Sequence, residues 1–285
     1  MKPTWNSLLL AGILAGSMIA CSKDLPSGPA HDVGEGQSAA SSKLRPANDD
    51  FDDAVVISAL PFTDRVSTSD ARTSRDDPLN DETCGFGSIG GHTVWYQFTP
   101  SENIRVNAST AGSDFYPNIF VYTGTRGNLT RVGCNFLPSS MTFEALAGET
   151  YFLLAGSSGS EPGGNLVFTV DRSIEVGVTI DPVGSVDPST GIATITGTVT
   201  CSRSAFFELG GAAQQRTVQA SQGSLFASGG CDGVTHWQGE VQAENGRFVP
   251  GTAEVSADAL FTANATSEER HGTAPPTTVQ LVAKN

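Results

Sequence analysis

The chain has 285 residues, with 30 acidic against 16 basic side chains, and a formal net charge of -14 at pH 7. This balance argues against nucleic acid as a partner, because phosphate binding needs clustered lysine and arginine. The same charge favours solubility, or cation binding at the surface.

The N-terminus reads as an export signal. One lysine precedes an apolar run from Leu8 to Ile19, which is short and weakly flanked for a membrane span. The run ends in the sequence MIAC, and this start resembles the lipobox of bacterial lipoproteins. The resemblance implies removal of residues 1–20, acylation of Cys21 and a membrane anchor in the bacterial cell envelope, at the outer membrane if the cell is Gram-negative, since Ser22 follows. The alternative is an ordinary secretory peptide with an incidental cysteine.

Residues 21–47 are rich in Ser, Gly, Pro and Ala and hold almost no large apolar side chain. Such a segment cannot bury enough surface to offset the entropy lost on ordering. We therefore expect a flexible tether between the anchor and the first domain.

From residue 48 onward, short apolar runs alternate with clusters of Gly, Asn, Asp and Ser. The runs are rich in Val, Phe, Tyr, Thr and Ile, which is typical of the strands of an antiparallel β-sandwich. No long stretch has helical periodicity, and residues 54–60 are expected to form at most a short helix or turn. Strands are expected at residues 92–100, 104–110, 117–124, 140–146, 150–156 and 165–170.

Three glycines, Gly85, Gly87 and Gly90, match the spacing G-x-G-x-x-G. A dinucleotide-binding loop must open a helix, whose first amides bind the phosphates. Here the glycines lead into HTVWYQF, which reads as a strand, so we expect no nucleotide binding. Neither Ser88 nor Ser158 lies in a G-x-S-x-G sequence, and no two histidines have metal-ligand spacing, so we also expect no catalytic site.

Four segments of this region carry a resemblance to a known family. They are NDDFDDAVVISALPFTD from Asn48, CGFGSIGGHTVWYQFTP from Cys84, AGSDFYPNIFVYTGTRGNLTRVGCN from Ala111 and FEALAGETYFLLAGSSG from Phe143. Together they resemble the bacterial pre-peptidase C-terminal domain over residues 48–172. The resemblance implies a jelly-roll-like β-sandwich, usually an appendage to secreted hydrolases.

Residues 173–285 are expected to form a second, Ig-like β-sandwich. The sequences DPVG and DPSTG place Pro and Gly where β-turns need them, and the alternation from Ile192 to Val199 places Ala193 and Ile195 on one face. Further strands are expected at residues 224–228, 236–244, 251–261 and 277–284. The region loosely resembles an uncharacterised Ig-like repeat of exported bacterial proteins, but Trp237 follows both local cysteines, so antibody-type anatomy is not implied.

Once Cys21 is set aside, four cysteines remain, two in each expected domain. Exported proteins meet an oxidising environment, so we expect two disulfides, Cys84–Cys134 and Cys201–Cys231. In the chain-entropy model each stabilises the fold by about 3.5–4 kcal/mol. Free buried thiols are the alternative.

Acidic residues gather in the segments NDDFDDA and SRDDPLNDE. Their oxygens suit calcium, and some relatives of the domain that residues 48–172 resemble bind calcium near this N-terminal segment. Asp50 and Asp53 are therefore weak calcium candidates, and no other cofactor is expected. The favoured alternative is a solvated acidic edge, because no spacing matches an EF-hand loop.

Aromatic residues divide between core and surface. Trp95, Tyr96 and Phe98 share one strand, so at least one of its faces is expected in the core. Tyr116 and Phe136 flank loops and, where exposed, would offer rings on which sugars stack.

These observations predict a lipid-anchored envelope protein that binds or adheres to a protein or glycan and has no catalytic activity. Two alternatives stay open. One is an accessory module or hydrolase partner of an exported peptidase or glycosidase, and the other is a structural envelope component.

Overall fold

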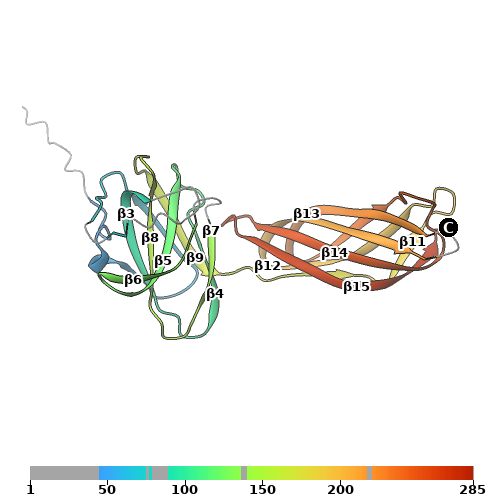
Figure 1. The fold of residues 1–285 in the computed structure, drawn as a ribbon, viewed down its shortest axis with the longest axis horizontal. Helices are drawn as coiled ribbons and strands as arrows, with labels where there is room; N and C mark the ends of the chain where they lie inside the picture. Colours follow the sequence, from blue (N-terminus) through green and yellow to red (C-terminus); the bar gives the residue numbers. More distant parts are fainter. Residues whose placement is uncertain (1–44, 75–76, 79–88, 136–139, 217–219, 285) are drawn as a thin grey trace, which may run out of the picture. The chain divides into compact units, whose positions relative to one another are not determined.

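The computed structural model describes residues 45–74, 77–78, 89–135, 140–216 and 220–284. Cys21, the signal peptide and the tether up to residue 44 lie outside these ranges. Apart from one short 3-10 turn, η1 (Phe51–Asp53), all regular structure in the described part is β-strand, which confirms the all-β fold class (Figure 1). No helix in the described ranges is long and apolar enough to cross a membrane.

Residues 45–172, here called the N-terminal sandwich, form two sheets. The first sheet has the order β1 (Val55–Ile57), β3 (Ile89–Phe98), β8 (Tyr151–Ser158), β5 (Pro117–Thr125), β6 (Asn128–Asn135). The second has the order β2 (Phe62–Ser67), β9 (Asn165–Arg172), β4 (Ile104–Ser109), β7 (Ser140–Ala145). Every pairing is antiparallel except that of β1 with β3.

The two sheets share one hydrophobic core, to which alternate residues of both contribute. Tyr96 of β3 stacks on Phe168 of β9 with ring centroids 4.1 Å apart, and both side chains are fully buried. Val106 of β4 and Leu153 of β8 belong to the same core. The strand alternation expected from the sequence thus produces a sandwich.

The other face of the first sheet is buried as well. Trp95 and Leu154 lie there with 0% exposure, and Phe51 of η1 packs edge-on against Trp95 with centroids 5.0 Å apart. The expectation that residues 54–60 form at most a helix or turn is wrong, because residues 55–57 are a strand paired with β3. The opening segment therefore contacts the first sheet in two ways: the Phe51 ring packs on its outer face, and β1 pairs along its edge.

Residues 173–284, here called the C-terminal sheet, form a single six-stranded sheet. Its strands are β10 (Val176–Ile180), β11 (Val183–Val186), β12 (Ala193–Gln215), β13 (Ser221–Val241), β14 (Gly251–Ala263) and β15 (Glu269–Ala283). β12 pairs with β14, β14 with β15, β15 with β11, and β11 again with β12, so the pairings form a closed circuit. Only the β11–β15 pairing is parallel.

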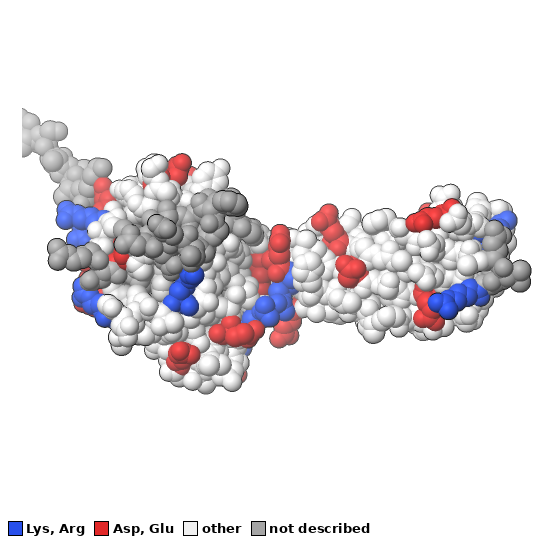
Figure 2. Space-filling model, in the orientation of Figure 1, with Lys and Arg blue, Asp and Glu red and all other residues white. Residues whose placement is uncertain are grey.

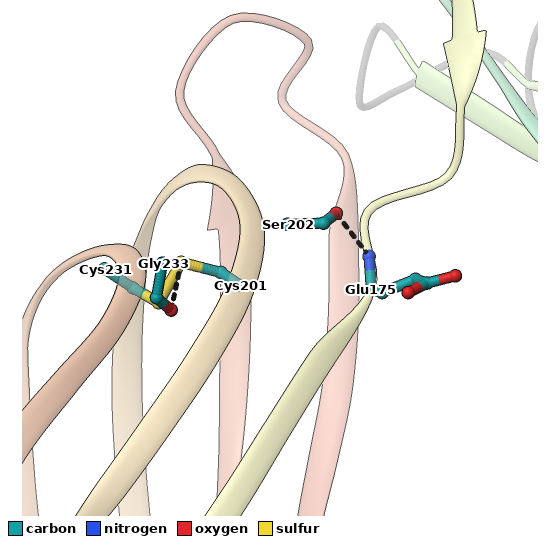
Figure 3. The surroundings of a disulfide bond; sticks show 5 residues. All are labelled: Glu175, Cys201, Ser202, Cys231 and Gly233. Atoms are coloured by element: carbon teal, nitrogen blue, oxygen red, sulfur yellow. Dashed lines mark hydrogen bonds between the residues drawn. A yellow bond between two sulfur atoms is a disulfide. The ribbon is translucent and has the colours of Figure 1, made fainter.

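The two longest strands, β12 and β13, each run in two parts, here called arms, which meet near the register shift at Cys201 and Ala205. The register between β12 and β13 shifts between Cys201 and Ala205, and the ribbon turns back close to Cys201 and close to Cys231 (Figure 3). The Glu244 amide, just after β13, donates to the carbonyl of Gln222 near the start of β13 at 2.8 Å. The chain after the second arm of β13 therefore lies beside the start of its first arm. The sequence predicts separate strands at 224–228 and 236–244 but not this return of the chain.

Alternation fills the core of the C-terminal sheet. Ala193 and Ile195, which the alternation places on one face, both have 0% exposure, so that face is the core side, and Phe207, Phe261 and Trp237 supply the large side chains. β15 begins at residue 269, earlier than the expected 277, because the polar run there still pairs with β14.

A buried carboxylate holds the first residues of the C-terminal sheet. Glu268 is 1% exposed and accepts hydrogen bonds from the Ser173 hydroxyl and the Ile174 amide. Arg203 donates to Glu268 at 3.0 Å and to Asp171 at 2.6 Å. Because hydrogen bonds to charged groups are the stronger ones, this cluster fixes the backbone where it enters the sheet.

Candidate functional site

The acidic opening segment is engaged in hydrogen bonds within the chain. Asp49 is 3% exposed and accepts from the Arg72 amide at 2.6 Å, and Arg45 pairs with its other oxygen. Asp50 accepts from the Ser74 hydroxyl at 2.7 Å. That hydrogen bond, followed by the charge of Arg45, lowers the pKa of Asp50 in spite of partial burial.

Asp77 is a second buried carboxylate of this region. It is 7% exposed and accepts three hydrogen bonds, from the Ser74 amide at 2.8 Å, the Thr93 hydroxyl at 2.7 Å and the Trp95 indole N–H at 3.0 Å. Burial raises the pKa of Asp77, and the three hydrogen bonds oppose that rise. The carboxylate thus joins the segment at 72–77 to β3, and its donors leave it little capacity for an outside ligand.

The calcium candidates do not converge. Asp50 is held by Ser74 and Arg45, whereas Asp53 is exposed at the end of η1. Among the described residues no group of three or more His, Cys, Asp or Glu is placed to hold a metal ion. Weak calcium binding at Asp50 and Asp53 stays a prediction.

The structure contains the expected Cys201–Cys231 disulfide, which joins the two chain reversals of β12 and β13 (Figure 3). Beside it, Ser202 accepts from the Glu175 amide at 3.0 Å, which fastens β10 to the same end of the sheet. A shallow depression of about 410 Å³ lies next to the bond and is lined by Glu175, Val176, Thr200, Cys201, Ser202, Gly233 and Val234. The disulfide therefore links the two chain reversals covalently at one end of the C-terminal sheet.

The other cysteines are only partly described. Cys134 is disulfide-bonded, whereas Cys84 lies outside the described residues. The pairing Cys84–Cys134 therefore stays a prediction, as does the lipidation of Cys21, which also lies outside.

His92 lies in β3, and Tyr116 immediately precedes β5. His92 has a positive φ of 51° at a register shift in β3, and its Nδ1 lies 3.1 Å from the Thr68 carbonyl oxygen. Tyr116 is 66% exposed, as a sugar-stacking residue would need to be. Phe136 lies outside the described residues, so of the two rings expected to form a sugar-stacking patch the structure describes Tyr116.

The outer face of the C-terminal sheet carries two exposed aromatic rings that no local sequence pattern indicated. Phe206 on β12 is 46% exposed and Phe226 on β13 is 72% exposed, although both lie within regular strands. A depression of about 330 Å³ adjoins Phe226 and is lined by Glu208, Leu209, Phe226, Ala227 and Ser228. Most of the visible surface over β13, β14 and β15 is uncharged (Figure 2). We call Phe206, Glu208, Phe226, Ser228 and Asp258 the outer aromatic face.

Comparisons with known proteins give no family. No protein-family model matches the chain, and no curated protein matches it. Among solved structures, the chain is similar to the apo structure of Bacteroides uniformis beta-glucuronidase 3, with 11% identity and a TM-score of 0.22, covering 67% of this chain and 29% of that one. It is also similar to Bifidobacterium dentium beta-glucuronidase complexed with coumarin-3-O-glucuronide, with 12% identity and a TM-score of 0.21, covering 75% of this chain and 46% of that one. The chain thus spans less than half the length of either neighbour, and similarity this low carries no argument about fold or function.

Proposed function

We propose that this chain is a binding or adhesion protein of the bacterial cell envelope, anchored through lipid at Cys21 and without catalytic activity. The relationship of residues 48–172 to the pre-peptidase C-terminal domain, and of residues 173–285 to an Ig-like repeat, belongs to the same proposal. The Cys201–Cys231 disulfide supports an oxidising compartment, where such bonds persist. The signal-like start and the polar tether support presentation away from a membrane.

The outer aromatic face carries the proposal. Single exposed apolar side chains are ordinary, whereas apolar side chains gathered on one face beside a depression are typical of binding surfaces. Phe206 and Phe226 occupy adjacent strands and point away from the core. A binding role accounts for two aromatic rings kept in water on a rigid sheet.

The test is an array of purified envelope glycans and exported proteins probed with the full-length protein in detergent micelles. We expect saturable binding to at least one component, and none by the reduced and unfolded chain. An exported hydrolase among the bound components would place the chain as its accessory module. Absence of saturable binding to every glycan and protein on the array would contradict a binding role.

A further inference from the structure

The outer aromatic face is built on the most regular part of the C-terminal sheet. The second arm of β12, residues 205–215, is hydrogen-bonded on one side to β13 and on the other to β14, without a register shift against either from residue 205 to 214. Side chains therefore alternate strictly there, with Phe207 and Leu209 in the core and Phe206 and Glu208 outside. The two phenylalanines are held at fixed positions by paired strands rather than by loops.

Each ring faces a glycine on the neighbouring strand. Phe206 pairs with Gly230, and Phe226 pairs with Gly210. A Cβ built on either glycine would meet no atom within 4 Å, so the space beside each ring is open. In many sheets an aromatic ring lies over a glycine of the neighbouring strand and covers its backbone. Phe226 is 72% exposed, so its ring does not fully cover Gly210 in this way. The ring faces are thus free to contact a ligand.

Polar groups surround the rings. Along β12, Glu208 lies between Phe206 and Gly210, and Gly210 is the residue that pairs with Phe226. Glu208 itself pairs with Ser228 of β13. Asp258 of β14 pairs with Gly210, on the side opposite Phe226. These carboxylates and hydroxyls are exposed, so they can exchange hydrogen bonds with a ligand that carries many hydroxyl groups.

The spacing favours an extended ligand. Phe226 pairs with Gly210, which is four residues beyond Phe206 on β12. The two phenylalanines are therefore separated by about 13 Å along the strand and by about 4.8 Å across to β13. The Cys201–Cys231 disulfide lies next to the Phe206–Gly230 rung, since Ala205 pairs with Cys231. A platform fixed at this length needs little ordering when a long ligand binds, which favours affinity.

We propose that the outer aromatic face binds a neutral polysaccharide, with the rings of Phe206 and Phe226 stacked on the apolar faces of two sugar units along one chain. Glu208 and Asp258 accept hydrogen bonds from the sugar hydroxyls between and beside the rings. Because both charged members of the face are acidic and the chain carries a net charge of -14, an anionic polymer is repelled. The inference rests on the proposed binding function and names its ligand class and surface.

The experiment is affinity electrophoresis and titration calorimetry of the full-length protein in detergent with hexasaccharides of glucose and of N-acetylglucosamine, and with polygalacturonate as the anionic comparison. We expect binding of at least one neutral glycan and none of polygalacturonate. Phe226→Ala should weaken binding at least tenfold and Phe206→Ala should weaken it as well, whereas Phe226→Trp should retain it, since a larger ring still stacks. Val56→Ala is the matched control, because Val56 is a 61% exposed apolar side chain of the N-terminal sandwich and its truncation should leave the affinity unchanged. Tyr116→Ala tests the other exposed ring on which a sugar could stack.

Each other outcome overturns the inference in a recognisable way. Glycan binding that survives both alanine variants, or is lost in Tyr116→Ala, places the ligand elsewhere and leaves the proposed binding function standing. Protein ligands on the envelope array together with no glycan binding also leave that function standing and remove the glycan. A wild-type dimer in sedimentation that dissociates in Phe226→Ala would mean that a second copy of the chain covers the face.

Discussion

Asp77 differs from Asp52 in its access to water, because Asp77 is 7% exposed. Asp52 lies exposed and pairs with Arg126, an arrangement that stabilises a fold by about 0–1 kcal/mol. Asp77 instead accepts from Thr93 and from Trp95, whose side chains are buried. Removing such an acceptor leaves buried donors without a partner, which costs about 1–3 kcal/mol.

We therefore expect Asp77→Asn to destabilise the protein by about 1–3 kcal/mol near neutral pH, since an amide cannot accept from all three donors. Burial raises the pKa of Asp77 above its ordinary value of 3.8. The folded state then binds the proton more tightly than the unfolded state, so the stability from this group is complete below the unfolded pKa and is lost as pH rises through the folded pKa. The destabilisation by Asp77→Asn should be larger at acidic pH than at neutral pH.

Urea unfolding followed by tryptophan fluorescence, at about pH 4 and about pH 7, measures this difference. Asp52→Asn is the matched control, and it should change stability by less than about 1 kcal/mol at either pH. Equal destabilisation by Asp77→Asn at both pH values would show that burial does not raise this pKa.

At the scale of elements, the disulfide closes the two long hairpin-like strands of the C-terminal sheet. Cys201 and Cys231 are 30 residues apart and lie beside the reversals of β12 and β13 (Figure 3). The bond limits the unfolded chain and also fixes the end of the sheet next to Phe206. Stability and the proposed binding face are therefore linked through one bond.

The double variant Cys201→Ser with Cys231→Ser should lower the free energy of unfolding by about 3.5–4 kcal/mol in the chain-entropy model. Chemical unfolding of the oxidised wild type and the double variant measures the difference. Reductant should lower the stability of the wild type more than that of the double variant, because only the wild type has this bond to lose. A double variant as stable as the oxidised wild type would show that the bond contributes no loop-closure entropy.

The elements differ in how well the sequence predicts them. Alternation predicts well which residues of a strand share a face, because the grouping of Ala193 with Ile195 needs only their own strand. It missed β1, whose three residues form a strand only against the edge of β3. It also missed the outer aromatic face, because the glycines opposite Phe206 and Phe226 are set by a pairing between distant residues, and no local pattern gives that register.

The buried Asp77 cluster was missed for a similar reason. Its sequence neighbours are polar and acidic, which is typical of a solvated edge. Burial comes from Thr93 and Trp95, which are distant in sequence and meet Asp77 only in the folded chain. The chemical type of a side chain predicts what it can bind, whereas its burial depends on the tertiary fold.

At the scale of the whole molecule, the proposal assigns distinct tasks to successive parts of the chain. Residues 21–47 have the composition of a tether, and the strands that follow provide folded surfaces, of which the outer aromatic face is exposed to ligands. Anchoring by lipid would concentrate such a surface at a membrane, where weak contacts with a repeating polymer add up. This arrangement depends on the chemistry of a single residue, Cys21.

If Cys21 carries the proposed lipid anchor, Cys21→Ala should release the protein from membranes or block its maturation, because each buried methylene of an acyl chain contributes about 0.8 kcal/mol to membrane binding. Fractionation of cells into membrane and soluble parts, with the mass of the mature chain, measures the effect. Ser22→Ala is the matched control, because it alters the neighbouring residue and keeps the thiol, so it should stay with the membranes. If the Cys21→Ala protein still partitions fully with membranes at the wild-type mature mass, another feature holds the chain there, and the glycan-binding surface must then be explained without a lipid tether.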